Sequence, residues 1–158
     1  MSAARLRAAG EEDLPAVADL WSRLDAFHHE LGMALPRPTD AAEKWLASFQ
    51  RTLGRFSFLW LAEQDGAPEA FLLARVKQSP AYLGAVQVGE ISDLYVSDGL
   101  RGSGIGAKLV KLALAKFKDL GVHSVEVQIQ AGNQAGLDFW AKQGFGGDLT
   151  QVRMLLGS

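Results

Sequence analysis

The sequence predicts a single α/β domain whose central sheet is mixed, mostly antiparallel, and covered by helices on both faces. Three runs with strand character follow one another between residues 56 and 96, separated only by turns, which indicates an antiparallel meander. A helical run then separates the third of these from a further strand, which indicates a parallel β-α-β unit in the same sheet. A chain of 158 residues can bury one sizeable core. We therefore expect one domain over residues 1–158.

The N-terminal part predicts a short strand and two helices. Residues 5–8 form the candidate strand, and apolar residues at three- and four-residue intervals predict a helix over 13–31. Two prolines shortly after it force a loop. A second helix is expected to begin at Asp40, with Glu43 completing a capping pair, and to run to Leu53.

The rest of the chain completes the expected order β-α-α-β-β-β-α-β-α-β. An Asp-Gly pair at residues 65–66 is typical of a hairpin turn, and glycines stand where both later helices should end. The remaining elements are expected in this order: strands over 56–63, 70–76 and 86–96, a helix over 105–120, a strand over 125–129, a helix over 133–142 and a final strand over 149–156.

Composition excludes several classes of protein. The net charge of −2 and the lack of a basic run disfavour a nucleic-acid partner. The absence of cysteine excludes disulfides, thiolate metal sites and a cysteine nucleophile. No apolar run is long enough to span a membrane, and the first residues do not resemble a signal peptide. We expect a soluble cytoplasmic protein without a membrane partner.

A glycine-rich stretch between the third meander strand and the next helix indicates an anion site. It reads Arg101-Gly102-Ser103-Gly104-Ile105-Gly106. The first turn of a helix has free N–H groups and a partial positive charge, and glycines remove side chains that would keep an anion at a distance. A pyrophosphate suits such a loop, with the guanidinium beside it. A glycine-rich helix start without a ligand is the alternative.

The same stretch also matches the dinucleotide fingerprint G-x-G-x-x-[G/A], but its context disfavours that interpretation. Residues 97–101 separate the strand from the first glycine, and only 52 residues follow Gly106, too few for the strands of a dinucleotide domain. Glu126, at about the spacing of a ribose-binding acid, lies within a strand rather than at its end.

Two motifs together resemble the GNAT superfamily of acetyl-CoA-dependent N-acetyltransferases. The stretch from Arg101 to Gly106 fills that family's signature [Q/R]-x-x-G-x-[G/A]. A second signature, approximately N-x6-Y-x-K-x-G-F, is matched from Asn133 to Phe145, with Trp140 at the tyrosine position. The expected element order is similar to the family's along nearly the whole chain.

The resemblance implies an enzyme that uses acetyl-CoA as co-substrate, needs no metal, and acetylates a primary amine of a small molecule or peptide by direct attack. It implies that the loop from Arg101 to Gly106 holds the pyrophosphate of CoA. This loop also contains Gly102, Ser103, Gly104 and Ile105. The resemblance further implies backbone contacts from Leu94 and Val96 to the pantetheine arm, where the strand bulges away from its neighbour, and contacts to CoA from Asn133, Phe139 and Trp140. From the residues alone, Leu94 and Val96 are core residues and Asn133 is a helix cap.

Glu90 is the first candidate for the general base, because several family members carry their base at the corresponding position. Asp93 is the alternative, although regular alternation directs it to the opposite face unless a bulge reverses the alternation. A surface glutamate in an ion pair is the competing interpretation of Glu90. Trp140 cannot act as the acid that the family's tyrosine often supplies, which raises an acyl-CoA-binding domain with little catalysis as the alternative function.

The acceptor side is less clearly marked in the sequence. His28 and His29 lie where such proteins build the acceptor site. Three interpretations of these histidines are open: a base, a metal ligand, and a surface feature at the end of the helix. Trp21 and Trp45 occur at core spacings and are interpreted as packing residues. Only 13 residues follow Phe145, so the last strand is expected to be short or to be completed by a partner chain in a homodimer.

Overall fold

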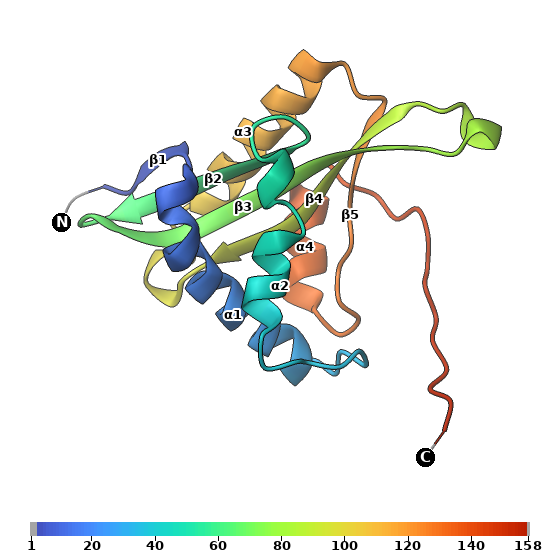
Figure 1. The fold of residues 1–158 in the computed structure, drawn as a ribbon, viewed down its shortest axis with the longest axis horizontal. Helices are drawn as coiled ribbons and strands as arrows, with labels where there is room; N and C mark the ends of the chain where they lie inside the picture. The colour runs from blue at the N-terminus through green and yellow to red at the C-terminus, as the bar shows by residue number, and fades with distance from the viewer. Residues whose placement is uncertain (1–2, 158) are drawn as a thin grey trace.

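The computed structural model describes residues 3–157, which form one five-stranded sheet in the order β1-β2-β3-β4-β5 (Figure 1). Neighbouring strands are antiparallel except for β4 and β5, which are parallel. The mixed, mostly antiparallel sheet is thus confirmed. The elements are β1 (Arg5–Ala8), α1 (Leu14–Glu30), α2 (Ala41–Ala47), β2 (Ser57–Gln64), β3 (Ala67–Gln78), β4 (Gln87–Val96), α3 (Ile105–Leu120), β5 (Ser124–Val127) and α4 (Gln134–Lys142).

Helices cover both faces of the sheet, as predicted. The central strand β3 is buried on both sides, and its side chains alternate between the two layers. Phe71 and Leu73 pack against α1 and α2, together with Trp45 and Phe49 of the α2 region. Leu72 and Ala74 face the other layer, which α3 and α4 supply. The core is therefore two apolar layers with the sheet between them.

A β-bulge interrupts the alternation of side chains along β4. Leu73 on β3 pairs with Asp93, but the next residue, Ala74, pairs with Ile91, so Ser92 is an extra residue on β4. Residues directly opposite each other on paired strands share a face. Leu73 belongs to the α1–α2 layer and Ala74 to the α3–α4 layer. Asp93 therefore faces α1 and α2.

The bulge places Glu90 on the same face as Asp93. Glu90 lies opposite Arg75, whose guanidinium donates to the Ser48 hydroxyl at the end of α2, at 2.9 Å. Arg75, and with it Glu90, is thus on the α1–α2 side. Regular alternation had predicted opposite faces for the two acids, and the extra residue Ser92 reverses it.

β4 and β5 separate beyond the bulge. Their ladder covers only Val88–Ile91 and Ser124–Val127. From Ser92 to Val96, the edge of β4 on that side has no strand partner among the described residues. The predicted splay between these two strands is therefore present, and it leaves the backbone of this part of β4 accessible.

Two local predictions are wrong. Residues 149–156 form no strand, because no neighbouring strand within the described chain supplies the ladder that strand-like alternation needs. Asp40 makes no side-chain hydrogen bond to cap α2, which ends at Ala47, with a 3-10 turn over Gln50–Thr52 after it. Over residues 3–157, none of the helices combines the length and hydropathy needed to span a bilayer.

An ion pair joins β1 to the start of α1. Both Nη atoms of Arg7 donate to the Asp13 carboxylate at 2.8 Å, and the Gly10 N–H donates to it at 2.8 Å. The hydrogen bonds from Arg7 hold the pKa of buried Asp13 below its ordinary value. This carboxylate therefore stabilises the fold above the ordinary carboxyl range, and the contribution is lost as the pH falls through the lowered pKa.

Arg7→Ala is expected to destabilise the protein by about 2–4 kcal/mol, because it leaves a buried carboxylate without its counter-ion. Arg5→Ala is the matched control, since Arg5 is mostly exposed and only approaches Glu63 at 3.8 Å. Chemical denaturation at neutral pH and at pH 3 measures both. A loss for Arg7→Ala no larger than for Arg5→Ala would contradict the assignment.

Candidate active site

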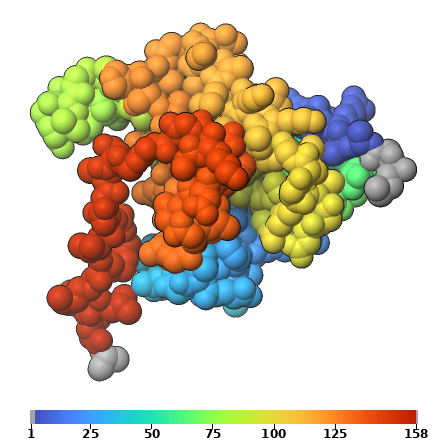
Figure 2. Space-filling view, turned by 180° about the vertical axis from the view of Figure 1, so that it is seen from behind, coloured from blue at the N-terminus to red at the C-terminus, as the bar shows by residue number. Residues whose placement is uncertain are grey.

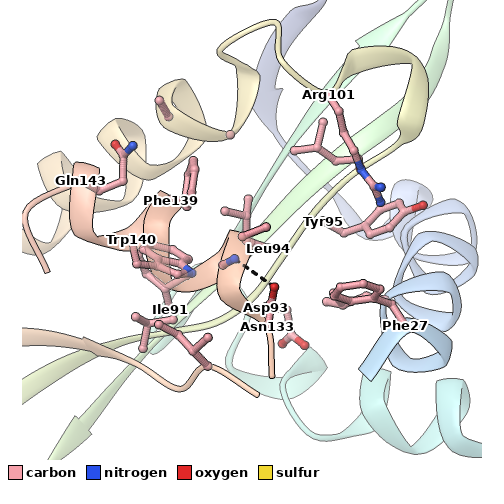
Figure 3. A pocket seen from close by; sticks show the side chains of 18 of the residues that line it. Phe27, Ile91, Asp93, Leu94, Tyr95, Arg101, Asn133, Phe139, Trp140 and Gln143 are labelled. Carbon is pink, nitrogen blue, oxygen red and sulfur yellow. Dashed lines mark hydrogen bonds between the residues drawn. The ribbon is translucent and has the colours of Figure 1, made fainter. Parts of the chain in front are cut away.

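A cleft of about 570 Å³ opens where β4 separates from β5. Four parts of the chain line it: the second half of α1, the β4 residues from Ile91 to Val96, the loop into α3, and α4 with the segment before it. In Figure 3, Phe139 and Trp140 of α4 form one side and Phe27 of α1 lies on the opposite side, with Asp93 between them. The cleft is thus long, and different elements supply its two ends.

One end of the cleft is the glycine-rich loop. Gly102 and Gly104 have φ values of +79° and +85°, in the left-handed region that favours glycine. Gly104 is the N-cap of α3, so the helix begins at Ile105 with its free N–H groups in the cleft wall. A Cβ at either glycine would meet nothing within 4 Å, which leaves open space over this helix start. The loop has the geometry of an anion site.

The side chains of this loop are already engaged. Arg101 Nε donates to the Val96 carbonyl at 3.0 Å, and its guanidinium pairs with Asp98 at 2.8 Å. Arg101 also lies over the Tyr95 ring, 5.8 Å from its centre (Figure 3). Ser103 donates to the Leu100 carbonyl and, unlike the other predicted loop residues, does not line the cleft.

The two sequence motifs meet at the start of α3. A Cβ on Gly106 would come within 3.3 Å of the Phe139 ring, so glycine allows α4 to pack closely here. Phe139 and Trp140 form an edge-to-face pair with centroids 5.1 Å apart, and Trp140 makes a second such pair with Phe145 at 5.1 Å. Trp140 is buried in the core and also lines the cleft.

Asn133 is the N-cap of α4. Its Oδ1 accepts a hydrogen bond from the Gly136 N–H at 2.9 Å (Figure 3). The residue also lines the cleft. Its cap role accounts for the asparagine without a ligand, and its position leaves the rest of the side chain facing the cavity. Leu94 and Val96 line the cleft as well, from the free edge of β4.

Asp93 is held by two tryptophans at the far end of the cleft from the glycine loop. Trp21 Nε1 donates to its Oδ1 at 3.1 Å, and Trp45 Nε1 donates to its Oδ2 at 3.2 Å. The two indoles are stacked, with centroids 5.2 Å apart. Burial raises the pKa of Asp93 above its ordinary value, while hydrogen bonds from Ser92 and the two indoles oppose that increase.

This arrangement could not be inferred from residue spacing. Trp21 and Trp45 do pack in the core, as predicted, but their N–H groups converge on one carboxylate from two helices. A long-range contact of this kind leaves no local pattern. The only sequence signal was the presence of an acid, Asp93, in an otherwise apolar strand end.

Glu90 occupies a different environment. It is absent from the cleft lining, and its carboxylate pairs with Lys77 at 3.3 Å. Lys77 also pairs with Glu126 on β5, so the three side chains form a small charge cluster. The structure therefore favours the ion-pair interpretation of Glu90 and brings Asp93, the alternative, into the cleft.

The two neighbouring histidines have different surroundings. His28 lines the cleft, and burial lowers its pKa below the ordinary value although Asp93 and Asp25 oppose the decrease. His29 instead contacts the backbone carbonyls of Asp25 and Leu35 at 2.9 and 3.2 Å. No group of acids and histidines within residues 3–157 is arranged to hold a metal ion.

Comparison with known proteins identifies relatives across the chain. The model of the "Acetyltransferase (GNAT) family" matches residues 20–145. An L-methionine sulfoximine/L-methionine sulfone acetyltransferase of Pseudomonas aeruginosa is 27% identical over 156 residues, which cover 98% of this chain and 88% of the relative.

Solved structures share the fold. A Clostridium acetobutylicum protein described as a predicted acetyltransferase, whose structure was solved with acetyl-CoA, has a TM-score of 0.80 and 16% identity, over 97% of this chain and 96% of that one. A putative acetyltransferase from Agrobacterium tumefaciens has a TM-score of 0.72 and 22% identity, over 96% and 99% of the two chains. These similarities show that the chain shares the overall fold of these structures.

Proposed function

Because the chain belongs to the acetyltransferase (GNAT) family and is an acetyl-CoA-dependent enzyme, we propose that it transfers the acetyl group to the primary amine of a small molecule. Residues 1–158 act as one catalytic domain in this proposal. The observation that carries it is one continuous cleft, with an anion-binding helix start at one end and a half-buried carboxylate of raised pKa, Asp93, at the other.

Acetyl-CoA fits the chemistry of the glycine-loop end. Its pyrophosphate would lie over the start of α3, where Gly102 and Gly104 leave open space and the helix offers free N–H groups. The pantetheine arm would follow the free edge of β4 at Leu94 and Val96, toward Phe139 and Trp140. Bound there, acetyl-CoA supplies an activated acyl group with a thiol leaving group.

Asp93 is the group that accepts the ammonium proton in this proposal. Its raised pKa brings the carboxylate closer to the pH range in which an amine must lose a proton, and it lines the cleft. The two indole N–H groups hold its orientation. Burial lowers the pKa of His28, which disfavours a competing positive charge in the cleft.

No acid is required at Trp140 for the thiol to depart. A thiol with an ordinary pKa of about 8.5 leaves as the thiolate near neutral pH. The indole can donate a hydrogen bond but cannot transfer a proton. The amine therefore attacks the thioester directly, and Trp140 packs beside the leaving group.

The acceptor is proposed to be a compact amine, and amino-acid analogues are the first candidates. Leu24, Phe27 and Tyr95 line the same cleft as Asp93 and give it apolar and aromatic surface, which suits a short side chain better than a polycation. The Pseudomonas aeruginosa relative is named for methionine sulfoximine and methionine sulfone, which are both small α-amines.

Thiol release from acetyl-CoA, measured against methionine sulfone, methionine sulfoximine, a polyamine and a short peptide, tests the function. We expect turnover with one or both amino-acid analogues and little with the polyamine. CoA affinity without thiol release for any amine would instead support an acyl-CoA-binding domain.

Trp45→Phe is expected to shift the acid limb of the pH–rate profile to higher pH. The substitution removes one hydrogen bond to the charged form of Asp93, so the pKa of that carboxyl rises further. The matched control is Trp60→Phe, at a tryptophan in the other core layer. Profiles of kcat/KM from pH 5 to 9 measure the shift; an unchanged acid limb in Trp45→Phe would contradict the role of Asp93.

A further inference from the structure

Arg75 is a half-buried cation on β3 without an acid partner among residues 3–157. Its guanidinium forms no ion pair with any carboxylate of this part of the chain. Glu90 lies directly opposite on β4, but it pairs with Lys77 instead. Removing a cation even partly from water without a counter-ion costs free energy unless other groups compensate for the loss. The surroundings of Arg75 therefore indicate what this charge does.

The guanidinium of Arg75 joins the end of α2 to the bulge of β4. Its two Nη atoms donate to Ser48, the C-cap of α2, at 2.9 Å to the hydroxyl and 3.3 Å to the carbonyl. Its Nε donates to the hydroxyl of Ser92, the extra residue of the bulge, at a longer 3.4 Å. The same guanidinium lies over the Phe49 ring, 5.7 Å from its centre. A planar fork of donors can hold several acceptors at once in this way.

Both ends of this connection are next to Asp93. Ser92 directly precedes it, and α2 carries Trp45, whose indole donates to its carboxylate at 3.2 Å. Leu73 lies opposite Asp93, and Arg75 follows two residues later on the same face. Such a diagonal neighbour on a paired strand is within reach of a long side chain. Burial raises the pKa of Asp93, and the positive charge of Arg75 is among the interactions that oppose this increase.

Other titratable groups on the elements around Asp93 are already engaged. Burial lowers the pKa of His28 on α1, which disfavours a positive charge there. Tyr95 of β4 packs in the same layer, with Arg101 over its ring. The following charged groups have ion-pair partners: Asp25 of α1 with Arg37, Lys44 of α2 with Asp40, Lys77 of β3 with Glu90 and Glu126, and Arg101 with Asp98. Among these groups, Arg75 is thus the cation that remains for Asp93.

We propose that Arg75 is a positioning residue for the base: its guanidinium holds the β4 bulge against the end of α2 and keeps the Asp93 carboxylate charged. This inference rests on the proposed role of Asp93 as the base. Arg75 does not line the cleft, so it acts through Asp93 and not on the substrates.

Arg75 lies on the opposite side of the sheet from the elements assigned to acetyl-CoA. Figure 1 shows α1 and α2 in front of the sheet, whereas α3, α4 and the loop between β4 and α3 form the opposite face in Figure 2. Arg75 contacts the α1–α2 side through Ser48 and Phe49. Acetyl-CoA affinity should therefore be independent of Arg75.

Titration of the Asp93 carboxyl by carbon NMR, on protein containing carboxyl-labelled aspartate and no substrate, tests the inference without reference to activity. The signal that is missing from Asp93→Asn identifies the residue. In Arg75→Gln the midpoint should move to higher pH, because the nearby positive charge is lost. Arg75→Lys keeps a positive charge, so its midpoint should stay closer to that of wild type.

Arg55→Gln is the matched control. The Arg55 guanidinium also lies over a phenylalanine ring, that of Phe56, 4.9 Å from its centre, but Arg55 is exposed and has no contact with β4. Its substitution should leave the Asp93 titration unchanged.

Kinetics then measure the consequence for acetyl transfer. Arg75→Gln should lower kcat near neutral pH by about tenfold, less than the loss of about 100-fold expected when the base itself is removed. This loss should shrink as the pH rises and Asp93 ionises, and the KM for acetyl-CoA should not change. Arg75→Lys should keep the acid limb of the profile but show a smaller loss of kcat, because an ammonium group cannot hold Ser48 and Ser92 together.

An unchanged Asp93 midpoint in Arg75→Gln would overturn the inference, whatever the activity of the variant. So would equal shifts in Arg75→Gln and Arg55→Gln, or a loss of acetyl-CoA affinity in Arg75→Gln, which would indicate general disruption of the cleft. Wild-type kcat in Arg75→Lys would overturn the part that concerns the bulge. A shifted midpoint with an unshifted acid limb would support the action of Arg75 on Asp93 but contradict Asp93 as the base, so the two claims fail separately.

Discussion

Asp93→Asn is expected to lower kcat by about 100-fold or more, the usual contribution of a positioned general base. The amide cannot accept the amine proton, whereas the KM for acetyl-CoA should be unchanged because the glycine loop is at the other end of the cleft. The loss should shrink as the pH rises, since more of the amine is then already neutral in solution. Steady-state kinetics from pH 6 to 10 measure both effects.

Glu90→Gln is the matched control for this substitution. Both acids lie on the same face of β4, but Glu90 pairs with Lys77 and does not line the cleft. We expect its kcat to stay within about threefold of wild type, since an exposed ion pair contributes little. A large loss for Glu90→Gln with near-normal activity for Asp93→Asn would transfer the role of base to Glu90.

A separate measurement, the affinity for acetyl-CoA, is needed to test whether Asp93→Asn is folded. The amide leaves one of the two indole N–H groups without an acceptor, which costs about 1–3 kcal/mol of stability. Acetyl-CoA affinity by calorimetry should nevertheless match wild type. Loss of affinity together with activity would mean that the substitution disrupts the cleft as a whole and would contradict the assigned role.

Gly104→Ala is expected to weaken acetyl-CoA binding by about tenfold or more, equivalent to one charge-assisted hydrogen bond. The φ of +85° is unfavourable for alanine, so the loop shifts its N–H groups, and the new methyl group occupies the open space over the helix start. Calorimetric titration with acetyl-CoA measures the change in Kd.

Gly121→Ala controls for backbone strain. Gly121 ends the same helix with a φ of +70°, and a Cβ there also meets nothing within 4 Å. Both variants should lose similar stability, but only Gly104→Ala should lose affinity. Equal Kd values in the two variants would contradict the assignment of the loop as the pyrophosphate site.

Local pattern sufficed for most of the fold. Apolar periodicity predicted α1 and α3 within one residue of their ends, and runs rich in apolar and aromatic residues, with a hairpin turn signal between two of them, predicted the meander. The prediction of a final strand over residues 149–156 is wrong. An apolar pattern shows which side chains can be buried, but it does not show which strand the segment pairs with. Among residues 3–157, this segment pairs with no strand.

The site was less predictable, because one inserted residue changed its geometry. Without the bulge at Ser92, Asp93 would lie on the opposite face from Glu90, and no spacing rule signals the insertion. The hydrogen bonds from Trp21 and Trp45 join residues far apart in the chain. By contrast, the loop from Arg101 to Gly106 is a local feature, and its motif predicted its place at the start of α3.

The central claim is direct acetyl transfer from acetyl-CoA to a small amine in this cleft. Incubation with acetyl-CoA labelled in the acetyl group, together with methionine sulfone or methionine sulfoximine, followed by mass spectrometry of both amine and protein, tests it most directly. The account predicts one labelled acetyl group on the amine for each CoA released, and an unmodified protein. Label that remains on acetyl-CoA despite tight binding, or that accumulates on the protein, would contradict it.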